Sequence, residues 1–315
     1  MSSATLPVID IDDLELPHTR AAIDSACREW GFFQVVNHRV DGQLIASLQR
    51  QMHAFFGQPI EAKRELLRTA DNPWGFYDRE LTRHTPDWKQ IYDYGPADGD
   101  SLMPQWPAAL PLLKPAIEAF YEACDALALR LVRVLSINLG MQADALDEYF
   151  RPAHTSFLRL NYYPPCPKPV RPEGVTVADD GYLGVNHHTD SGAITLLLQD
   201  DQPGLEVLNE GAWHLVEPRR DALVVNIGDI AQVWSNDRYR AALHRALASA
   251  DAERFSIAFF SNPTYSTVYE PLPTTVDARN PPRYRPINWG EFRSQRTAGD
   301  YADHGEYHQI SHYHR

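Results

Sequence analysis

The second half of the chain consists of short apolar segments separated by turn residues, and this spacing restricts the fold more than any other feature. From about residue 155, eight β-like segments follow one another closely: SFLRLNYYP, LGVNHHTD, AITLLLQ, GLEVL, WHLVEP, ALVVNIGD, ALHRALA and RFSIAFFSN. Turn sequences such as DDQPG, NEGA, PRRD and SNDR separate them. Eight short strands at this spacing predict a sandwich or barrel, and a double-stranded β-helix, or jelly roll, fits them well.

Helical periodicity is confined mainly to the first half. Apolar residues recur at helical spacing over residues 19–31, 42–56 and 112–139, with strand-like PVIDI and FFQVVNH between or before them. A final helix is expected around residues 288–301. We therefore expect a mostly β protein with flanking helices that forms one compact catalytic unit. Its expected parts are an N-terminal α/β region (1–110), a long supporting helix (111–150), the jelly-roll core (151–270) and a C-terminal helix and tail (271–315).

Composition and charge exclude several classes of partner. Of the 315 residues, 43% are hydrophobic, which is enough for a substantial core. The net charge of -13 and the lack of a Lys/Arg block oppose binding to nucleic acid. No window approaches the ~18 apolar residues of a membrane span, and we find no signal peptide. Three separated cysteines without a CxxC pair predict a reduced, cytoplasmic protein.

A candidate metal site lies in the segment LGVNHHTD. Residues two apart on a strand share a face, so His188 and Asp190 are expected side by side. His244, 54 residues beyond Asp190 in an apolar strand, is the candidate third ligand. Two histidines and one carboxylate match the facial triad of non-haem Fe(II), although hydrolytic zinc sites use the same ligand types. His187 has the opposite parity, and we expect it to have a structural or supporting role.

The segment RFSIAFF distinguishes between these chemistries. It places Arg254 and Ser256 two apart on one expected strand face. A guanidinium holds a carboxylate through two parallel hydrogen bonds, and a hydroxyl adds a third. The pair therefore predicts a carboxylate anchor beside the metal, of the kind that a chelating keto acid needs.

These residues, taken in order, resemble a known family. The chain is similar to the plant-type, isopenicillin N synthase-like branch of the Fe(II)/2-oxoglutarate-dependent dioxygenases. The resemblance rests on HTD, LHR and RFS, on NYYPPCPKP, PGLEVL and NIGD, and on the N-terminal LPVIDI and WGFFQVVNH. It covers nearly the whole chain in the family's order, although each motif alone is weak.

The resemblance implies roles for individual residues. The two histidines and the aspartate of the candidate metal site bind Fe(II), while Arg254 and Ser256 hold the distal carboxylate of 2-oxoglutarate. Tyr163 is implied as a hydrogen-bond partner of this cosubstrate, with Asn161 as a second one. Phe260 stands where relatives place an aromatic ring against the organic substrate. His187 departs from the family pattern, in which a different residue commonly precedes the metal histidine.

The implied activity is oxidation of a C–H bond in a small, specialised-metabolite substrate. O2 drives oxidative decarboxylation of 2-oxoglutarate to succinate and CO2, and the outcome is hydroxylation, desaturation or cyclisation. Three alternatives stay open at the level of sequence: an isopenicillin N synthase-like oxidase that uses no 2-oxoglutarate, a non-catalytic β-barrel that binds a small acid, and a zinc hydrolase. The sequence identifies neither the substrate nor the oligomeric state.

Two further segments are candidates for shaping specificity. The loop RELTRHTPDWK is predicted to form a substrate-facing rim, with these residues as the candidates: Arg79, Arg83, His84, Trp88 and Lys89. The C-terminal segment contains four histidines without regular spacing, and we expect a solvated tail or lid rather than a second metal site: His304, His308, His312 and His314.

Overall fold

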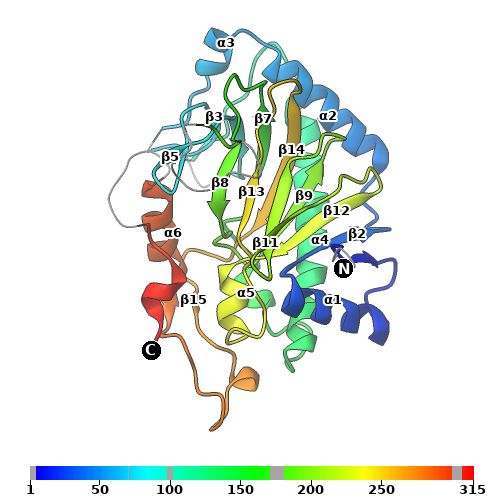
Figure 1. The fold of residues 1–315 in the computed structure, drawn as a ribbon, viewed down its shortest axis with the longest axis vertical. Helices are drawn as coiled ribbons and strands as arrows, with labels where there is room; N and C mark the ends of the chain where they lie inside the picture. The colour runs from blue at the N-terminus through cyan, green and yellow to red at the C-terminus, as the bar shows by residue number, and fades with distance from the viewer. Residues whose placement is uncertain (1–4, 70, 98–101, 171–180, 300–306) are drawn as a thin grey trace.

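The computed structural model describes residues 5–69, 71–97, 102–170, 181–299 and 307–315, and two facing β-sheets form its centre (Figure 1). The major sheet has eight strands, in the order β1 (Val8–Asp10), β2 (Phe32–Val36), β12 (Ala222–Ile227), β9 (Ile194–Gln199), β14 (Arg254–Ser261), β7 (Phe157–Tyr163), β6 (Gln90–Tyr94) and β3 (Gly75–Tyr77). The minor sheet has four, in the order β11 (Ala212–Leu215), β10 (Leu205–Asn209), β13 (His244–Ala246) and β8 (Val185–His188). Two short pairs complete the strands: β4 (Leu81–Thr82) with β5 (Thr85–Pro86), and β15 (Val268–Tyr269) with β16 (Ile287–Asn288).

The predicted double-stranded β-helix is confirmed, because consecutive strands from β7 to β14 alternate between the two sheets, apart from the β10–β11 hairpin within the minor sheet. Pairing within the sheets is antiparallel except between β1 and β2, which are parallel. Strands β1, β2, β3 and β6 come from the first 110 residues and extend the major sheet on both sides of the strands from the second half. The N-terminal region is thus hydrogen-bonded into the same sheet as the rest of the core.

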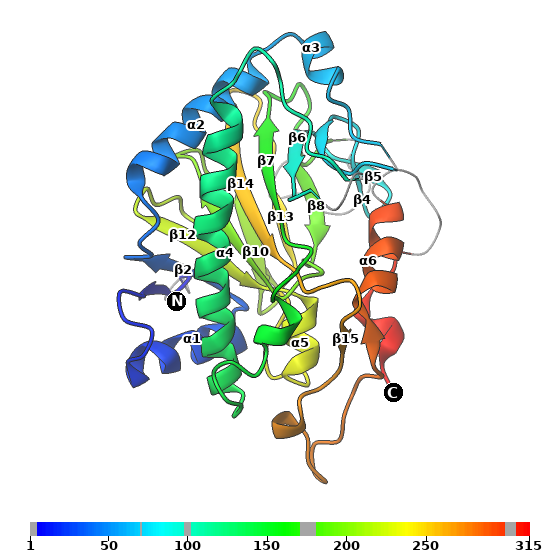
Figure 2. The ribbon, with the colours of Figure 1, turned by 180° about the vertical axis from the view of Figure 1, so that it is seen from behind.

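Helices surround the two sheets. They are α1 (Pro17–Glu29), α2 (Gly42–Phe56), α3 (Ile60–Arg64), α4 (Leu113–Asn138), α5 (Asp229–Trp234) and α6 (Trp289–Ala298), with 3₁₀ turns at Asp147–Tyr149, Pro273–Thr275 and Ile310–Tyr313. Helix α4 runs along the back of the major sheet (Figure 2), and its buried residues recur at helical spacing. Helix α2 has the predicted bounds, and the Asp41 carboxylate caps it by accepting a hydrogen bond from the backbone N–H of Gln43 (2.8 Å).

Successive side chains of strand β14 point alternately into the hydrophobic core and toward the candidate site. On β14, Phe259 is fully buried and its ring meets Tyr121 of α4 edge-on, with 5.2 Å between ring centroids. The neighbouring Phe260 points to the opposite face, toward the space between the sheets, where it stacks on Phe157 at 4.5 Å. Phe259 therefore packs between the major sheet and α4, whereas Phe260 lies between the two sheets.

Two further expectations concern the cysteines and the membrane. Cys27, Cys124 and Cys166 are buried and make no disulfide, and burial raises the pKa of the Cys27 and Cys124 thiols. Among the described residues, none of the helices combines the length and the apolar character that a membrane crossing requires.

Substitution of the two adjacent phenylalanines tests this division between core and site. We expect Phe259→Ala to lower the free energy of unfolding by about 3–5 kcal/mol, because it leaves a cavity between β14 and α4. Phe260→Ala is the matched control, and we expect a smaller loss because its ring is only partly buried. Urea denaturation of both variants measures the difference. Equal losses would contradict the assignment of the two rings to different layers.

Candidate active site

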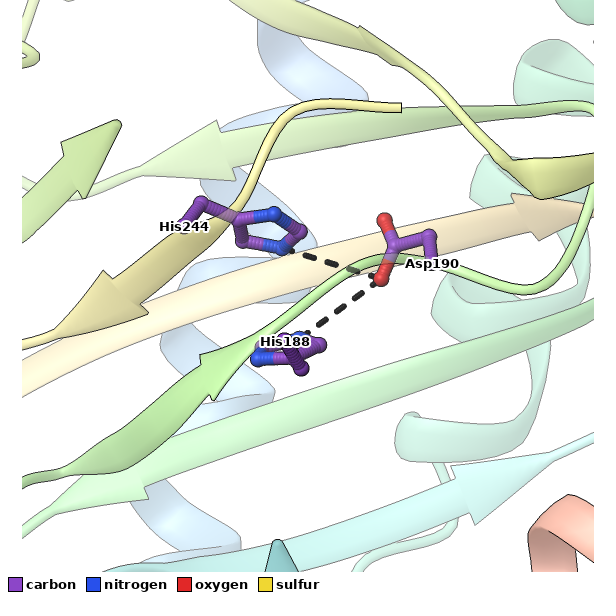
Figure 3. Close-up of side chains that lie close together, drawn as sticks. All are labelled: His188, Asp190 and His244. Atoms are coloured by element: carbon purple, nitrogen blue, oxygen red, sulfur yellow. Dashed lines mark ion pairs between the residues drawn. The ribbon is translucent and has the colours of Figure 1, made fainter. Parts of the chain in front are cut away.

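His188, Asp190 and His244 converge between the two sheets (Figure 3). The Nε2 atoms of His188 and His244 lie 3.6 and 3.7 Å from Oδ1 of Asp190. One candidate ligand atom from each residue lies within 4.8 Å of the other two. This spacing suits a single metal ion bound by two imidazoles and one carboxylate on one side, with the other side open.

Hydrogen bonds orient each candidate ligand. Nδ1 of His188 lies 2.8 Å from the carbonyl oxygen of Asn186, and Nδ1 of His244 lies 3.1 Å from that of Ala242. Each carbonyl accepts the Nδ1 proton, which directs the Nε2 lone pair to the centre of the site. The donor set and its supporting bonds therefore fit Fe(II).

Asp190 is held from the major sheet. Its Oδ2 accepts hydrogen bonds from the Thr195 hydroxyl on β9 (2.5 Å) and the Asn226 amide on β12 (2.7 Å). Oδ1 is thereby left facing the two histidines. Burial alone raises the pKa of Asp190, but the two imidazoles and these two hydrogen bonds outweigh it, so the pKa lies below its usual value. Burial, followed by the nearby His244, lowers the pKa of His188 to about 3.

The prediction that His188 and Asp190 share a strand face is wrong in its details. Strand β8 ends at His188, and Asp190 lies in the loop that follows it. The backbone leaves the minor sheet there, and the carbonyl of Asp190 accepts a hydrogen bond from the N–H of Asp229 at the start of α5 (2.7 Å). The turn brings the carboxylate beside the imidazole. The His188–His244 contact is a cross-strand pair between β8 and β13.

The predicted carboxylate anchor lies on one side of the metal site. Arg254 and Ser256 share one face of β14, and their cross-strand partners on β7 are Tyr163 and Asn161. All four side chains line a cavity of about 80 Å³ that also contacts the three candidate metal ligands. The sequence therefore predicted the members of this cavity correctly, while their roles toward a cosubstrate stay predictions.

Local packing holds the anchor in place. The Arg254 guanidinium donates through Nη2 to Oε1 of Gln199 (2.9 Å) and lies over the Tyr163 ring, 5.0 Å from its centroid. The Tyr163 ring in turn passes so close to Gly184 that a Cβ atom there would lie 2.7 Å from the ring. Glycine in the LGVNHH segment is thus required by the close approach of this ring.

A second cavity, of about 140 Å³, adjoins the first one, and His188 and Asp190 line both. Phe260 lines both cavities, and its role against an organic substrate stays a prediction. The predicted rim loop contributes Lys89, together with Glu80 and Thr82, which sequence reasoning did not single out. Three arginines were also missed, namely Arg159 on β7 and Arg293 and Arg296 on α6.

The missed residues had weak sequence signals. Arg159 stands two residues before Asn161 and so shares its strand face, a signal that was available. Arg293 and Arg296 had no such signal, because α6 is far along the chain from the metal site and its orientation depends on how the C-terminal segment packs.

A buried network of charges underlies this second cavity. Lys89 Nζ lies 2.6 Å from Oε2 of Glu80 and 3.0 Å from Oδ2 of Asp87. Arg159 binds Glu80 (2.9 Å) and Asp93 (2.7 Å), and Arg68 bridges the same two carboxylates. Burial opposes charge on Glu80, but the three cations outweigh it and hold its pKa well below the usual value.

The network reaches the metal site through Asp87. Oδ1 of Asp87 accepts hydrogen bonds from the backbone N–H (3.0 Å) and the side-chain amide (3.1 Å) of Asn186. The carbonyl of the same asparagine orients His188. The charge network therefore fixes the strand that carries a candidate metal ligand.

Among the described residues, the histidines outside the triad belong to no cluster that could hold a metal ion. His187 is half-buried on β8, and burial, with Arg83 and Arg245 nearby, lowers its pKa. His308 and His312 pack against each other, and His308 also packs against Phe292 of α6, so this part of the tail is folded onto the protein. His304 lies outside the described residues. Among those residues, the only cluster of metal-ligating side chains is the triad of His188, Asp190 and His244.

Comparison with known proteins identifies the family. Residues 154–263 match the model of the 2OG-Fe(II) oxygenase superfamily, and residues 6–109 match the N-terminal model described as non-haem dioxygenase in morphine synthesis. Jasmonate-induced oxygenase 2 of Arabidopsis thaliana is 34% identical over 309 residues, covering 93% of this chain and 79% of the relative. The chain belongs to the 2OG-Fe(II) oxygenase superfamily. This oxygenase is an oxidoreductase that uses Fe(II), 2-oxoglutarate and O2, and it falls in the plant-type branch.

Solved structures agree with this assignment. The crystal structure of JOX2 in complex with 2OG, Fe and JA superposes with a TM-score of 0.83 at 34% identity, covering 98% of the oxygenase and 89% of that chain. A full-length Neurospora crassa protein, solved in complex with alpha-KG, superposes with a TM-score of 0.81 at 27% identity, covering 95% and 97% of the two chains. The zinc hydrolase and the non-catalytic binding protein are therefore set aside.

The buried network generates a stability prediction. We expect Lys89→Met to lower the free energy of unfolding by about 3–5 kcal/mol, because Glu80 and Asp87 are then left buried without their shared cation. The control is Arg39→Met, which removes an exposed ion pair with Asp12 and is expected to change stability far less. Urea denaturation at neutral pH compares the two variants. A tolerated Lys89→Met substitution would contradict the proposed balance of charge.

The low pKa of His188 generates a titration prediction. Because the pKa is lowered from its ordinary value to about 3, the imidazole stays neutral as the pH falls from 7.5 to about 5. In the metal-free protein, the NMR signals of the His188 ring are expected to keep their positions over this range. Comparison with His188→Gln assigns the signals. A midpoint near pH 6.5 for His188 would refute the prediction.

Proposed function

We propose that the oxygenase oxidises a C–H bond of a small, specialised-metabolite molecule and couples this to decarboxylation of 2-oxoglutarate to succinate and CO2. His188, Asp190 and His244 hold Fe(II). Arg254 and Ser256 hold the distal carboxylate of 2-oxoglutarate. The observation that carries the proposal is the presence of two adjoining cavities that share His188 and Asp190, only one of which is lined by the anchor pair.

The protein's own contribution is positional. The Arg254 guanidinium offers two parallel donors to a carboxylate, and the Ser256 hydroxyl adds a third, so one end of the cosubstrate is fixed. Its keto acid end would then be available to Fe(II) held by His188, Asp190 and His244. Fe(II), when bound, supplies the activation of O2, while the buried walls exclude water and the second cavity holds the target carbon nearby.

An oxidase that needs no 2-oxoglutarate is the competing function. Such an enzyme uses the Arg254 and Ser256 pair for the carboxylate of its own substrate. The Tyr163 and Asn161 side chains, paired with the anchor across β7 and β14, favour a dedicated cosubstrate cavity instead. The second cavity leaves separate space for an organic substrate, which favours the 2-oxoglutarate reaction further.

We also propose the cellular compartment and the type of metabolism in which the enzyme acts. We place the enzyme in the cytoplasm, and its three buried thiols without a disulfide support a reducing compartment. The role in specialised metabolism is supported by relatives such as the flavanone 3-dioxygenase 2 of Oryza sativa subsp. japonica, which is 34% identical over 300 residues.

Anaerobic spectroscopy tests the proposal directly. Addition of Fe(II) and 2-oxoglutarate without O2 is expected to produce a visible metal-to-ligand charge-transfer band. Asp190→Asn is expected to abolish the band, because the neutral amide is a poorer ligand than the carboxylate. Arg254→Gln is expected to weaken 2-oxoglutarate binding at least about tenfold, because the charge-assisted bonds are lost.

The controls separate the two functions. Arg220→Gln alters an exposed arginine on the loop before β12 and is expected to leave the band unchanged. Succinate release in the presence of O2 gives a second readout. Protein that binds Fe(II) without giving the band would favour the oxidase, and protein that binds no Fe(II) would overturn the assignment of the metal ligands.

A further inference from the structure

We propose that the ammonium group of Lys89 donates a hydrogen bond to the keto-acid end of 2-oxoglutarate, while Arg254 and Ser256 hold the distal end. This inference rests on the proposed function and deepens it, since it adds a positioning residue to the cosubstrate cavity. Its basis is a row of residues in the wall of that cavity with a cation at each end.

The register of the major sheet places Lys89 in line with the anchor. Tyr163 on β7 is the cross-strand partner of Arg254 on β14. On the other side of β7, Gln90 at the start of β6 pairs with Tyr162. Extending this antiparallel register by one residue brings Lys89, directly before β6, opposite Tyr163. Lys89, Tyr163 and Arg254 thus form one row, and all three line the cavity of about 80 Å³.

The length of this row suits a short dicarboxylate. Neighbouring strands lie about 4.8 Å apart, so the backbone positions of Lys89 and Arg254 are about 10 Å apart. Both side chains line the cavity between these positions. A five-carbon dicarboxylate that lies along the row therefore meets one cation with each of its ends.

Lys89 keeps its positive charge although it is buried. Its Nζ lies 2.6 Å from Oε2 of Glu80 and 3.0 Å from Oδ2 of Asp87. Burial favours the neutral amine, but the charges of Asp87 and Glu80 outweigh it and raise the pKa of Lys89 above its ordinary value. The side chain is therefore an ammonium group at neutral pH.

The ammonium group has a donor left for a ligand. Of its three N–H groups, two are used by Glu80 and Asp87, which are its acceptors among the residues that the structure describes. Because these two carboxylates already offset its charge, Lys89 offers a directed hydrogen bond more than net positive charge. The third N–H is available to a ligand in the cavity that Lys89 lines.

The position of Lys89 selects the end of the cosubstrate that it meets. Lys89, His188 and Asp190 each line both cavities, whereas Arg254 and Ser256 line only the first of the two. Lys89 therefore shares the boundary between the cavities with two of the candidate metal ligands. The keto-acid end of 2-oxoglutarate is the end that chelates Fe(II), so the carboxylate next to the keto group is the one within reach of Lys89.

Arg159 also lines both cavities, but its guanidinium is held differently. It donates from Nε and Nη2 to the carboxylate of Asp93 and from Nη1 to that of Glu80. All three of its nitrogens thus donate to carboxylates of the protein. Lys89 is the better candidate for a bond to the cosubstrate.

A bond from Lys89 fixes the carboxylate that the reaction releases as CO2. With Arg254 at one end and Lys89 at the other, the cosubstrate has a single orientation relative to the metal triad. The buried charge network therefore contributes a donor to cosubstrate binding in addition to its support of β8.

Ligands that lack one end of 2-oxoglutarate test this inference. 2-Oxopentanoate has a methyl group in place of the distal carboxylate, and 4-oxopentanoate has a methyl group in place of the carboxylate next to the keto group. The two probes are isomers with the same charge. Each is titrated calorimetrically, alongside 2-oxoglutarate, into anaerobic enzyme loaded with Fe(II).

Variants assign each cation to one end. Lys89→Gln is expected to lower the affinity for 2-oxoglutarate and for 2-oxopentanoate at least about tenfold, and to change that for 4-oxopentanoate by less than about twofold. The double variant Lys89→Gln/Asp87→Asn removes one charge of each sign, which guards against unfolding, and the same pattern is expected. Arg254→Gln is expected to weaken 4-oxopentanoate and not 2-oxopentanoate. Lys114→Gln, which removes an exposed ion pair with Glu118, is the matched control and is expected to have no effect.

The pattern across the two ends separates recognition from structural support. If Lys89 only supports β8, its loss lowers the affinity for all three ligands or for Fe(II) itself, and either result would overturn the inference. Unchanged binding of 2-oxopentanoate by the Lys89 variants, or no binding of it by the wild-type enzyme, would also overturn it. Wild-type enzyme that binds Fe(II) but gives no charge-transfer band with 2-oxoglutarate would instead show that the proposed function has failed.

Discussion

The site depends on one buried carboxylate that stays ionised at the junction of the two sheets. Asp190 is nearly excluded from solvent, and burial by itself would favour its neutral form. Two imidazoles from the minor sheet and two donors from the major sheet offset that cost. Neither sheet alone supplies all four partners. Asp190 therefore keeps its charge only because the two sheets face each other at this point.

The two cavities at this junction use arginine in different ways. Arg254 is held on a central strand of the major sheet, with Gln199 and Tyr163 fixing its guanidinium. Arg293 and Arg296 line the second cavity from α6, a helix of the C-terminal segment that lies at the edge of the molecule (Figure 1). The first arrangement is part of the rigid core of the fold, whereas the second depends on a peripheral helix. Such a division allows the lining of the second cavity to change while the candidate metal ligands and Arg254 stay in place.

The buried network of Lys89, Arg159, Arg68 and their carboxylate partners connects the strand of His188 to the second cavity. It connects the loop before β6 to β7 through Glu80 and Arg159, and it reaches β8 through Asp87 and Asn186. A network of this kind costs desolvation energy, and it is stable because the carboxylates have cations at hydrogen-bonding distance. Glu80, Lys89 and Arg159 of this network line the second cavity, so the wall of that cavity and the orientation of His188 share the same support.

The sequence by itself determined the jelly-roll core, the span of α2, the three candidate metal ligands and the anchor pair, because these follow from strand periodicity and from motifs with fixed spacing. It placed Asp190 on a strand, whereas the chain turns out of β8 after His188. Only the tertiary structure decided which charges line the second cavity. Arg159, Arg293 and Glu80 come from distant segments, and their meeting depends on the packing of α6 and of the loop before β6. Local patterns fix the face of a strand, but contacts between segments far apart in the chain are set by the packing of the whole core.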